Sequence, residues 1–166
     1  MNTTADQSTF LIRPLHEDDH AWVQGVLMRY WASTTQVTRG RLHHADRLPG
    51  FAAFRGEEEV GLITYHIDGD ECEIVTHNSM DGEGGIGSCL LAEVRTLARA
   101  EGCRRLWLVT TNDNTPAMRF YQRREFDMVA LHHNAIEGYR SMKTEIPSEG
   151  LDGIRIKHEI EMEYRL

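Results

Sequence analysis

Residues 154–166 alternate without a break between a mainly apolar series and a charged series. The first series is Ile154, Ile156, His158, Ile160, Met162, Tyr164 and Leu166, and the second is Arg155, Lys157, Glu159, Glu161, Glu163 and Arg165. Successive side chains of a strand point to opposite faces, so this period of two predicts a strand with one face buried and the other in water. Such a strand needs neighbours, and the chain must therefore build a sheet.

The rest of the chain supplies further strands and several helices. Its 166 residues suit one domain, so we expect residues 1–166 to form it, with 1–8 disordered. Strands are predicted over 9–14, 50–55, 60–67, 71–77, 106–109 and 126–131, and helices after a cap at Asp18, after the glycines before residue 88, after a cap at Thr115, and over 135–142. This order predicts an α/β (α+β) fold, a mixed and mostly antiparallel sheet of about seven strands with helices on both faces.

Charge and cysteine content exclude several classes of protein. Lys and Arg number 18 against 26 Asp and Glu, a net charge of −8, which disfavours general binding to nucleic acid because that binding relies on basic side chains. We find no apolar run near the ~20 residues of a membrane span, and the N-terminus lacks the pattern of a signal peptide. Cys72, Cys89 and Cys103 are odd in number and widely spaced, typical of buried thiols in a reducing compartment. We expect a cytoplasmic protein with no nucleic-acid or membrane partner.

A glycine-rich loop, Gly82-Glu83-Gly84-Gly85-Ile86-Gly87, lies between a predicted strand and a predicted helix. Glycines let the backbone approach a ligand, and the free amides at a helix start bind phosphate oxygens. A flexible turn without a ligand is the alternative interpretation. The spacing also fits the dinucleotide fingerprint weakly, with Asp113 as its ribose-binding acid, but three strands precede this unit, where a nucleotide domain would begin with it.

Several segments together resemble the GNAT superfamily of acyl-CoA N-acyltransferases. These are Glu73-Ile74-Val75, Gly85-Ile86-Gly87-Ser88-Cys89-Leu90-Leu91, the run from Asn112 to Tyr121, and Phe126. The resemblance is specific over roughly residues 60–131, by the joint spacing of these elements. Two positions depart from the family pattern: Gly82 stands where Gln or Arg is usual, and Arg124-Glu125 stand where Leu-Gly is usual.

The resemblance implies that acetyl-CoA is the co-substrate and assigns residues to it. The loop 82–88 would wrap the pyrophosphate, the strand end would pair with the pantetheine arm where it splays from the 106–109 strand, and an asparagine would contact the cofactor. The residues concerned are Gly82, Glu83, Gly84, Gly85, Ile86, Gly87 and Ser88, then Val75, Thr76 and His77, and finally Asn114. We expect no metal, since no spacing such as H-x-x-x-H offers a site.

Two residues are the candidate catalytic groups. Tyr121 matches the tyrosine that protonates the departing thiolate in many family members, although the residue alone also fits a core aromatic. Glu73 is the preferred base; it shares a strand face with Glu71, and two carboxylates on one face raise each other's pKa, unless both simply face solvent. His77 is the second choice as base.

The function that these residues favour is transfer of an acetyl group from acetyl-CoA to a primary amine of a small molecule or peptide, directly in a ternary complex. The alternatives are a non-catalytic acyl-CoA-binding module and, less favoured, a dinucleotide-binding oxidoreductase. The amine would bind between the first helix, a polar loop at 32–49 that holds the solvated pair His43-His44, and the segment 132–153. The last strand, if it lies at a sheet edge, could pair two copies into a homodimer.

Overall fold

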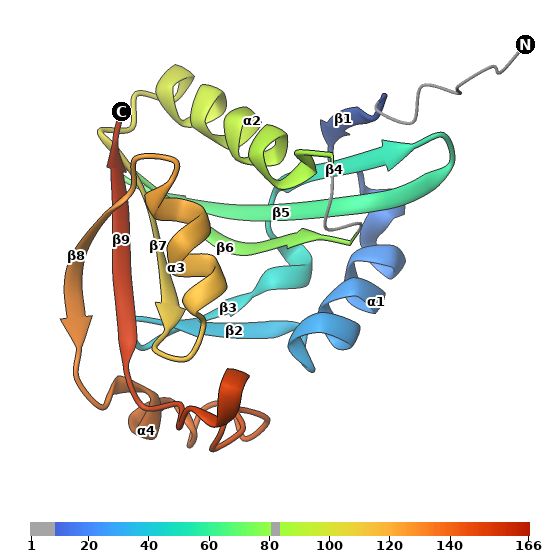
Figure 1. The fold of residues 1–166 in the computed structure, drawn as a ribbon. Helices are drawn as coiled ribbons and strands as arrows, with labels where there is room; N and C mark the ends of the chain where they lie inside the picture. The colour runs from blue at the N-terminus through green and yellow to red at the C-terminus, as the bar shows by residue number, and fades with distance from the viewer. Residues whose placement is uncertain (1–8, 81–83) are drawn as a thin grey trace, which may run out of the picture.

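The structure is a computed structural model that describes residues 9–80 and 84–166. A seven-stranded sheet forms its centre, in the order β1-β4-β5-β6-β7-β9-β8 (Figure 1). Its strands are β1 (Leu11–Pro14), β4 (Gly50–Arg55), β5 (Glu58–Asp68), β6 (Glu71–Ser79), β7 (Arg105–Thr111), β8 (Asp127–His132) and β9 (Glu159–Arg165). Every neighbouring pair is antiparallel except β6 and β7, so the predicted mixed, mostly antiparallel sheet is confirmed.

The parallel pair β6–β7 is short. It joins only Glu71 to Arg105, Cys72 to Leu106 and Glu73 to Trp107, after which the two strands no longer pair. On its other side β6 carries a bulge, because Thr76 opposes Thr64 and Ile74 opposes Tyr65, which leaves Val75 between them without a partner. The predicted splaying of the strand end from the 106–109 strand is therefore present.

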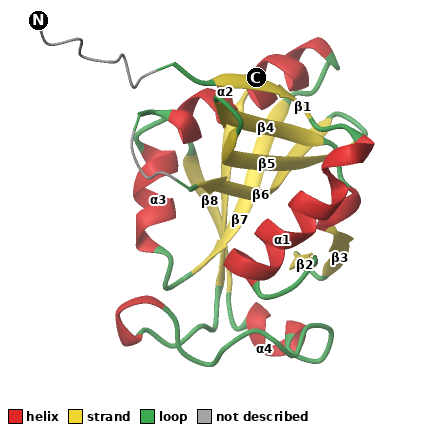
Figure 2. Ribbon diagram, turned by 90° about the vertical axis from the view of Figure 1, so that its right-hand side faces the viewer, coloured by secondary structure: helices red, strands yellow, loops and turns green. Residues whose placement is uncertain are grey.

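Helices cover both faces of the sheet, as predicted (Figure 2). The helix α1 (His20–Trp31) packs Val23, Val26 and Leu27 against Leu62 and Val75. The helices α2 (Ile86–Ala100) and α3 (Thr115–Gln122) contribute Leu90, Val94 and Tyr121 to the larger core on the opposite face. A short α4 (Ala135–Tyr139) replaces the predicted helix over 135–142. Within the described ranges we find no helix that is both long and apolar enough to cross a membrane.

The segment 32–49 is not a loop, so that prediction is wrong. It forms the hairpin β2 (Thr35–Thr38) and β3 (Arg41–His44), followed by a 3-10 turn at Ala45–Arg47. The turn residues Arg39 and Gly40 both have positive φ, 47° and 76°, as the tightest hairpin connection requires. Strands of four residues carry too little alternation to stand out among the polar side chains of this stretch.

The prediction for the last strand was partly wrong. Only residues 159–165 pair in the sheet, and the acidic face is not in water: Glu159, Glu161 and Glu163 are 2%, 5% and 8% exposed. Their burial follows from the topology, because β9 lies between β7 and β8 and the hairpin β2–β3 reaches Glu159 and Glu161 through Arg39. The edge strands are β1 and β8, so the premise of a homodimer through an exposed last strand is also wrong.

Three local expectations also differ. The first helix begins after a 3-10 turn at Glu17–Asp19, and Asp19 rather than Asp18 accepts the amide of His16 while pairing with Arg13. The cap of α3 is Asn114, whose Oδ1 accepts the amide of Ala117, and not Thr115. Cys72 and Cys103 are buried thiols as expected, whereas Cys89 is exposed.

Candidate active site

A cleft opens where β6 and β7 part. A cavity of about 300 Å³ lies there, between the strand ends, the end of α1 and the start of α3. Its lining includes Ile74, Val75 and His77 from β6, Leu108 from β7, Asn114 and Tyr121. Beyond Glu73 the edge of β6 that faces β7 makes no ladder bonds, so its backbone is open to an extended ligand. Thr76, by contrast, turns inward, where its hydroxyl lies 2.6 Å from that of Thr64.

Tyr121 and His77 form a hydrogen-bonded pair in the wall of this cleft. His77 Nε2 lies 3.0 Å from the carbonyl of Gly87, which can only accept, so Nε2 carries the proton. We therefore assign His77 Nδ1 as the acceptor of the Tyr121 hydroxyl, 2.7 Å away. Burial lowers the pKa of His77 to about 4 and raises the pKa of Tyr121 well above its usual range, so the pair is neutral at neutral pH.

This arrangement changes the expectation for His77. A second-choice base would need a free nitrogen facing the amine, and both ring nitrogens are already engaged. The side chain instead orients Tyr121 and locks the start of α2 to β6. A Cβ at Gly87 would lie 3.5 Å from His77 and 3.4 Å from Phe120, which is ordinary van der Waals contact, so both rings pack directly against this turn of α2.

The start of α2 provides free amides at one end of the cleft. Gly84 and Gly85 have positive φ of 77° and 76°, which glycine alone adopts without strain. The amides of Ile86, Gly87 and Ser88 precede the first helical hydrogen bond, from Cys89 to Gly85, and have no acceptor within the helix. Gly82 and Glu83, predicted to join them in phosphate binding, lie outside the described residues.

The second departure from the family pattern, Arg124-Glu125, contacts this helix start through Arg124. Arg124 donates through Nε to the Ser88 hydroxyl at 3.0 Å and stacks on the Phe120 ring. Glu125 occupies the position of the usual glycine with φ of 67°, a conformation that is strained for glutamate. The local turn is therefore retained without the residue that suits it.

Glu73 is buried, 3% exposed, at the last rung of the β6–β7 ladder. Its Oε2 lies 3.2 Å from Nε2 of His43, and within the described residues its Oε1 has no hydrogen-bond partner. His43 Nε2 also lies 3.0 Å from the Thr38 hydroxyl. The contact of His43 Nε2 that has hydrogen-bond geometry is the one to Thr38, while Glu73 Oε2 lies within ion-pair distance of the same nitrogen. Oε1 is left as the free acceptor.

His43 is therefore not a solvated loop residue, and that interpretation was wrong. It is 4% exposed and comes from β3, which folds over the start of β6. The one local sign of this hairpin is Gly40, because glycine is favoured at the second position of a two-residue turn.

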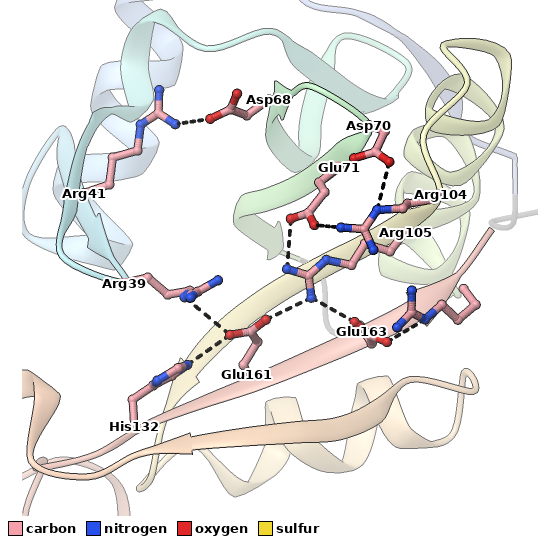
Figure 3. Close-up of polar contacts among 11 residues, drawn as sticks. Arg39, Arg41, Asp68, Asp70, Glu71, Arg104, Arg105, His132, Glu161 and Glu163 are labelled. Carbon is pink, nitrogen blue, oxygen red and sulfur yellow. Dashed lines mark hydrogen bonds and ion pairs between the residues drawn. The ribbon is translucent and has the colours of Figure 1, made fainter.

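A second cavity of about 410 Å³ lies on the other side of the Glu73–Trp107 rung. Its lining combines acids and bases from the hairpin, β5, β6 and β7: Thr38, Arg39, Arg41, His66, Asp68, Asp70, Glu71, Glu73 and Trp107. Most of these acids have basic partners, which Figure 3 shows: Arg41 pairs with Asp68, Arg104 with Asp70, and Arg104 and Arg105 with Glu71. Glu71 is thus an ion-paired wall residue, whereas Glu73 contacts only the imidazole of His43 among the ion-pair partners found in the described chain.

Arg105 pairs with Glu71, a residue of the cavity lining, and with two glutamates of β9. Its guanidinium pairs with Glu161 at 2.9 Å, Glu163 at 2.8 Å and Glu71 at 2.9 Å (Figure 3). The three carboxylates raise its pKa well above the usual range although burial opposes them. This cluster explains why glutamates on the inner face of β9 can be buried.

The structure gives less support to a dinucleotide site or a metal site. Asp113, the candidate ribose-binding acid, is 5% exposed and accepts the amide of Leu151 at 3.0 Å. Across the described ranges we find no group of three or more His, Cys, Asp or Glu side chains placed to hold a metal ion.

A mixed sheet opened between its two parallel strands, beside a helix that starts at glycines, is the architecture of acetyltransferases. The chain belongs to the acetyltransferase (GNAT) family, whose sequence model matches residues 12–126. It is 38% identical to the uncharacterized protein YdhI of Bacillus subtilis (strain 168) over 151 residues, 90% of this chain and 94% of that protein. The predicted family and enzyme class, acetyltransferase, are thereby confirmed.

Solved structures share the fold. A Bacillus subtilis acetyltransferase in complex with CoA superimposes with a TM-score of 0.69 at 16% identity, covering 95% of this chain and 99% of that one. A GNAT family acetyltransferase from Elizabethkingia anophelis with acetyl-CoA bound gives a TM-score of 0.68 at 18% identity, covering 98% and 100%. Fold and family thus agree.

Proposed function

We propose that the protein transfers an acetyl group from acetyl-CoA to a primary amine, directly and within a ternary complex. One observation carries this proposal: the two cavities lie on either side of the same rung, Glu73–Trp107. The cleft beyond the rung suits a thioester laid along β6, and the cavity before it holds a buried carboxylate with a free oxygen. Donor and acceptor would therefore meet at one point of the sheet.

The residues of the cleft fit CoA in three ways. The left-handed glycines and the free amides from Ile86 to Ser88 suit a pyrophosphate, and the open edge of β6 near Val75 suits the amide groups of pantetheine. Arg124, tied to Ser88, places a positive charge beside the same helix start. The backbone amides from Val75 to His77 would hold the thioester carbonyl as its oxygen becomes negative. Asn114 lines the cleft, but its Oδ1 caps α3, so only its amide nitrogen is free for a ligand.

Glu73 is the proposed base. It would take a proton from the bound ammonium, through an ordered water where the two are not in contact, and the neutral amine would then attack the thioester carbonyl. The N–C bond forms and the C–S bond breaks. Glu73 passes the first proton to solvent and then takes the second proton of the nitrogen by the same route, and Tyr121, after protonating the thiolate, recovers its proton from solvent. His43 would hold Glu73 Oε2, so that Oε1 alone faces the acceptor.

Tyr121 is the proposed acid. Its hydroxyl lines the cleft and keeps its proton at neutral pH, because burial raises its pKa. To protonate the departing thiolate, the hydroxyl must turn from His77 toward the sulfur as negative charge develops there. The hydrogen bond to His77 therefore holds the proton donor in place before the reaction.

Calorimetric titration with acetyl-CoA, using NADH and ATP as controls, tests the co-substrate. Binding of acetyl-CoA alone, followed by CoA release that depends on an added amine, is the expected result. Acetyl-CoA binding without turnover of any amine would favour the non-catalytic module, and NADH binding would favour the oxidoreductase. We further propose a cytoplasmic location, which the three free thiols support.

A further inference from the structure

Arg39 holds a strained position above the acceptor cavity. It is the first residue of the two-residue β2–β3 turn, with φ of 47°, where asparagine or glycine would be unstrained. Its backbone amide donates to both oxygens of the buried Glu159, at 3.1 and 3.3 Å, which fixes the turn. Strain that the surroundings hold in place is typical of functional positions.

The guanidinium of Arg39 is held at Nε, and its terminal nitrogens remain available. Its Nε pairs with Oε2 of Glu161 at 3.5 Å, and its carbon atom Cζ lies 5.7 Å from the centre of the Trp107 ring. Neither terminal nitrogen donates a hydrogen bond within the part of the chain that the structure describes, and the side chain is 47% exposed while lining the cavity. A planar guanidinium that is held through Nε, and whose two terminal nitrogens have free N–H groups, is suited to bind a carboxylate.

Arg39 shares its carboxylate partner with two other side chains. Glu161, its partner, also pairs with Arg105 at 2.9 Å and with His132 at 2.9 Å (Figure 3). Burial would raise the pKa of Glu161, but the hydrogen bonds from His132 and Arg105 and the charge of Arg39 lower it overall. One carboxylate therefore serves several bases, and the terminal N–H groups of Arg39 are left for a further acceptor.

The lining contributed by β6 contains an acceptor that is not used. Glu73 Oε1 is buried and without a partner in the described residues, and it lines the same cavity as Arg39. The cavity of about 410 Å³ lies within the range of small-molecule sites. A ligand with an ammonium group and a carboxylate would satisfy both walls at once.

We propose that the acceptor is a free amino acid, whose ammonium group binds Glu73 and whose carboxylate binds Arg39. This inference rests on the proposed acetyltransferase function and names its substrate class. It also explains why an acidic chain keeps an arginine in a strained turn at the mouth of its acceptor cavity.

Matched acceptors test the proposal. Acetyl-CoA-dependent CoA release is measured for α- and ω-amino acids, their amides, and the amines that lack the carboxylate, with the parent and with Arg39→Asn. Asn-Gly is a favoured hairpin turn, so Arg39→Asn should fold at least as well as the parent. Arg47→Asn is the control, because Arg47 is exposed, ends the 3-10 turn that follows the same hairpin, and does not line the cavity.

The expected result is a preference of the parent for acids over amides, and a loss of about 10- to 100-fold in that ratio for Arg39→Asn. Comparing ratios removes the difference in amine basicity between acid and amide. Arg47→Asn should keep the ratio within about twofold of the parent, since Arg47 does not line the cavity. Arg39→Lys keeps the charge but loses the planar guanidinium, so its ratio should fall between those of the parent and Arg39→Asn.

Two results would overturn the proposal: a parent that acetylates amides or plain amines but no amino acid, or a ratio that Arg39→Asn leaves unchanged. In both cases the acetyltransferase function would stand. Failure of that function would look different, as binding of acetyl-CoA with no amine of any kind supporting CoA release.

Discussion

The hydroxyl of Tyr121 donates to Nδ1 of His77 across 2.7 Å, and His77 can accept it because its other nitrogen donates to Gly87. This relationship joins α3, β6 and the start of α2 at one point. It also fixes the direction in which the hydroxyl proton of Tyr121 points before substrate binds.

Replacing Tyr121 with phenylalanine should remove the acid and little else. We expect kcat to fall by about 10²-fold, in the range typical of a lost general acid, with acetyl-CoA affinity within about twofold of the parent. Steady-state kinetics and calorimetry give the two values. Tyr65→Phe, which removes a hydroxyl on β5 away from the cleft, should leave both unchanged. Equal kcat in Tyr121→Phe and the parent would contradict the assignment.

His77 should make stability depend on pH. Its pKa is lowered from 6.5 to about 4 in the folded state, so between these values the unfolded chain binds a proton that the folded chain does not. The contribution of the neutral His77 to the free energy of unfolding is therefore complete above pH 6.5 and is lost as the pH falls to 4. The loss amounts to about 3 kcal/mol. Urea unfolding at a series of pH values should show a flatter slope over this window for His77→Asn. The exposed His44→Asn should keep the parent's slope.

Glu73 and His43 should affect activity unequally. Glu73→Gln removes the base, and we expect kcat/KM to fall by about 10²- to 10³-fold. His43→Asn keeps the base but frees Oε2, so a loss of about tenfold and an altered pH–rate profile are expected. A profile identical to the parent's would show that His43 only fills space. Both variants should bind acetyl-CoA like the parent.

Arg105 should be far more important for stability than its neighbour Arg104. Arg105→Met would leave buried Glu161 and Glu163 without this partner, at a cost of about 3–5 kcal/mol in the free energy of unfolding. Arg104 is half exposed and pairs with Asp70 and Glu71 at the surface, so Arg104→Met should cost about 1 kcal/mol or less. Chemical denaturation of the two variants provides the comparison, and similar losses would refute it.

Glu125 should be a site where glycine stabilises the protein. Its φ of 67° is strained for glutamate and free for glycine, so Glu125→Gly should raise the free energy of unfolding by about 0.5–1 kcal/mol. The midpoint of urea unfolding measures the gain. Gln122→Gly, at the last residue of α3, should instead lower it by a similar amount.

Much of the fold was predictable because its signals are local. The strand before the glycine loop, the helix after it and the turn at Asn114 each carry their own pattern, and their joint spacing indicated both family and cleft. The identity of Tyr121 and Glu73 as candidates came from the same spacing. Their roles remain predictions, although the structure places both residues at the two cavities.

The acceptor side was not predictable because it depends on contacts between distant segments. Glu161 is charged and alternates with apolar residues, so sequence alone places it in water; only the arrival of Arg39, Arg105 and His132 makes its burial tolerable. The proposed role of His43 likewise depends on its contact with Glu73, which lies on another strand. Partners of this kind leave no local pattern.

The two parts of the sheet, β1-β4-β5-β6 and β7-β9-β8, are joined by one ladder of three rungs. An extended ligand in the gap beyond those rungs would act as a missing strand and complete the seam. Co-substrate binding would then also hold the molecule together, and the fraction of chains that survive heat or proteases in a cell would follow the supply of the acyl donor. The supply of the acyl donor would then affect the abundance of the protein in the cell as well as its catalytic rate.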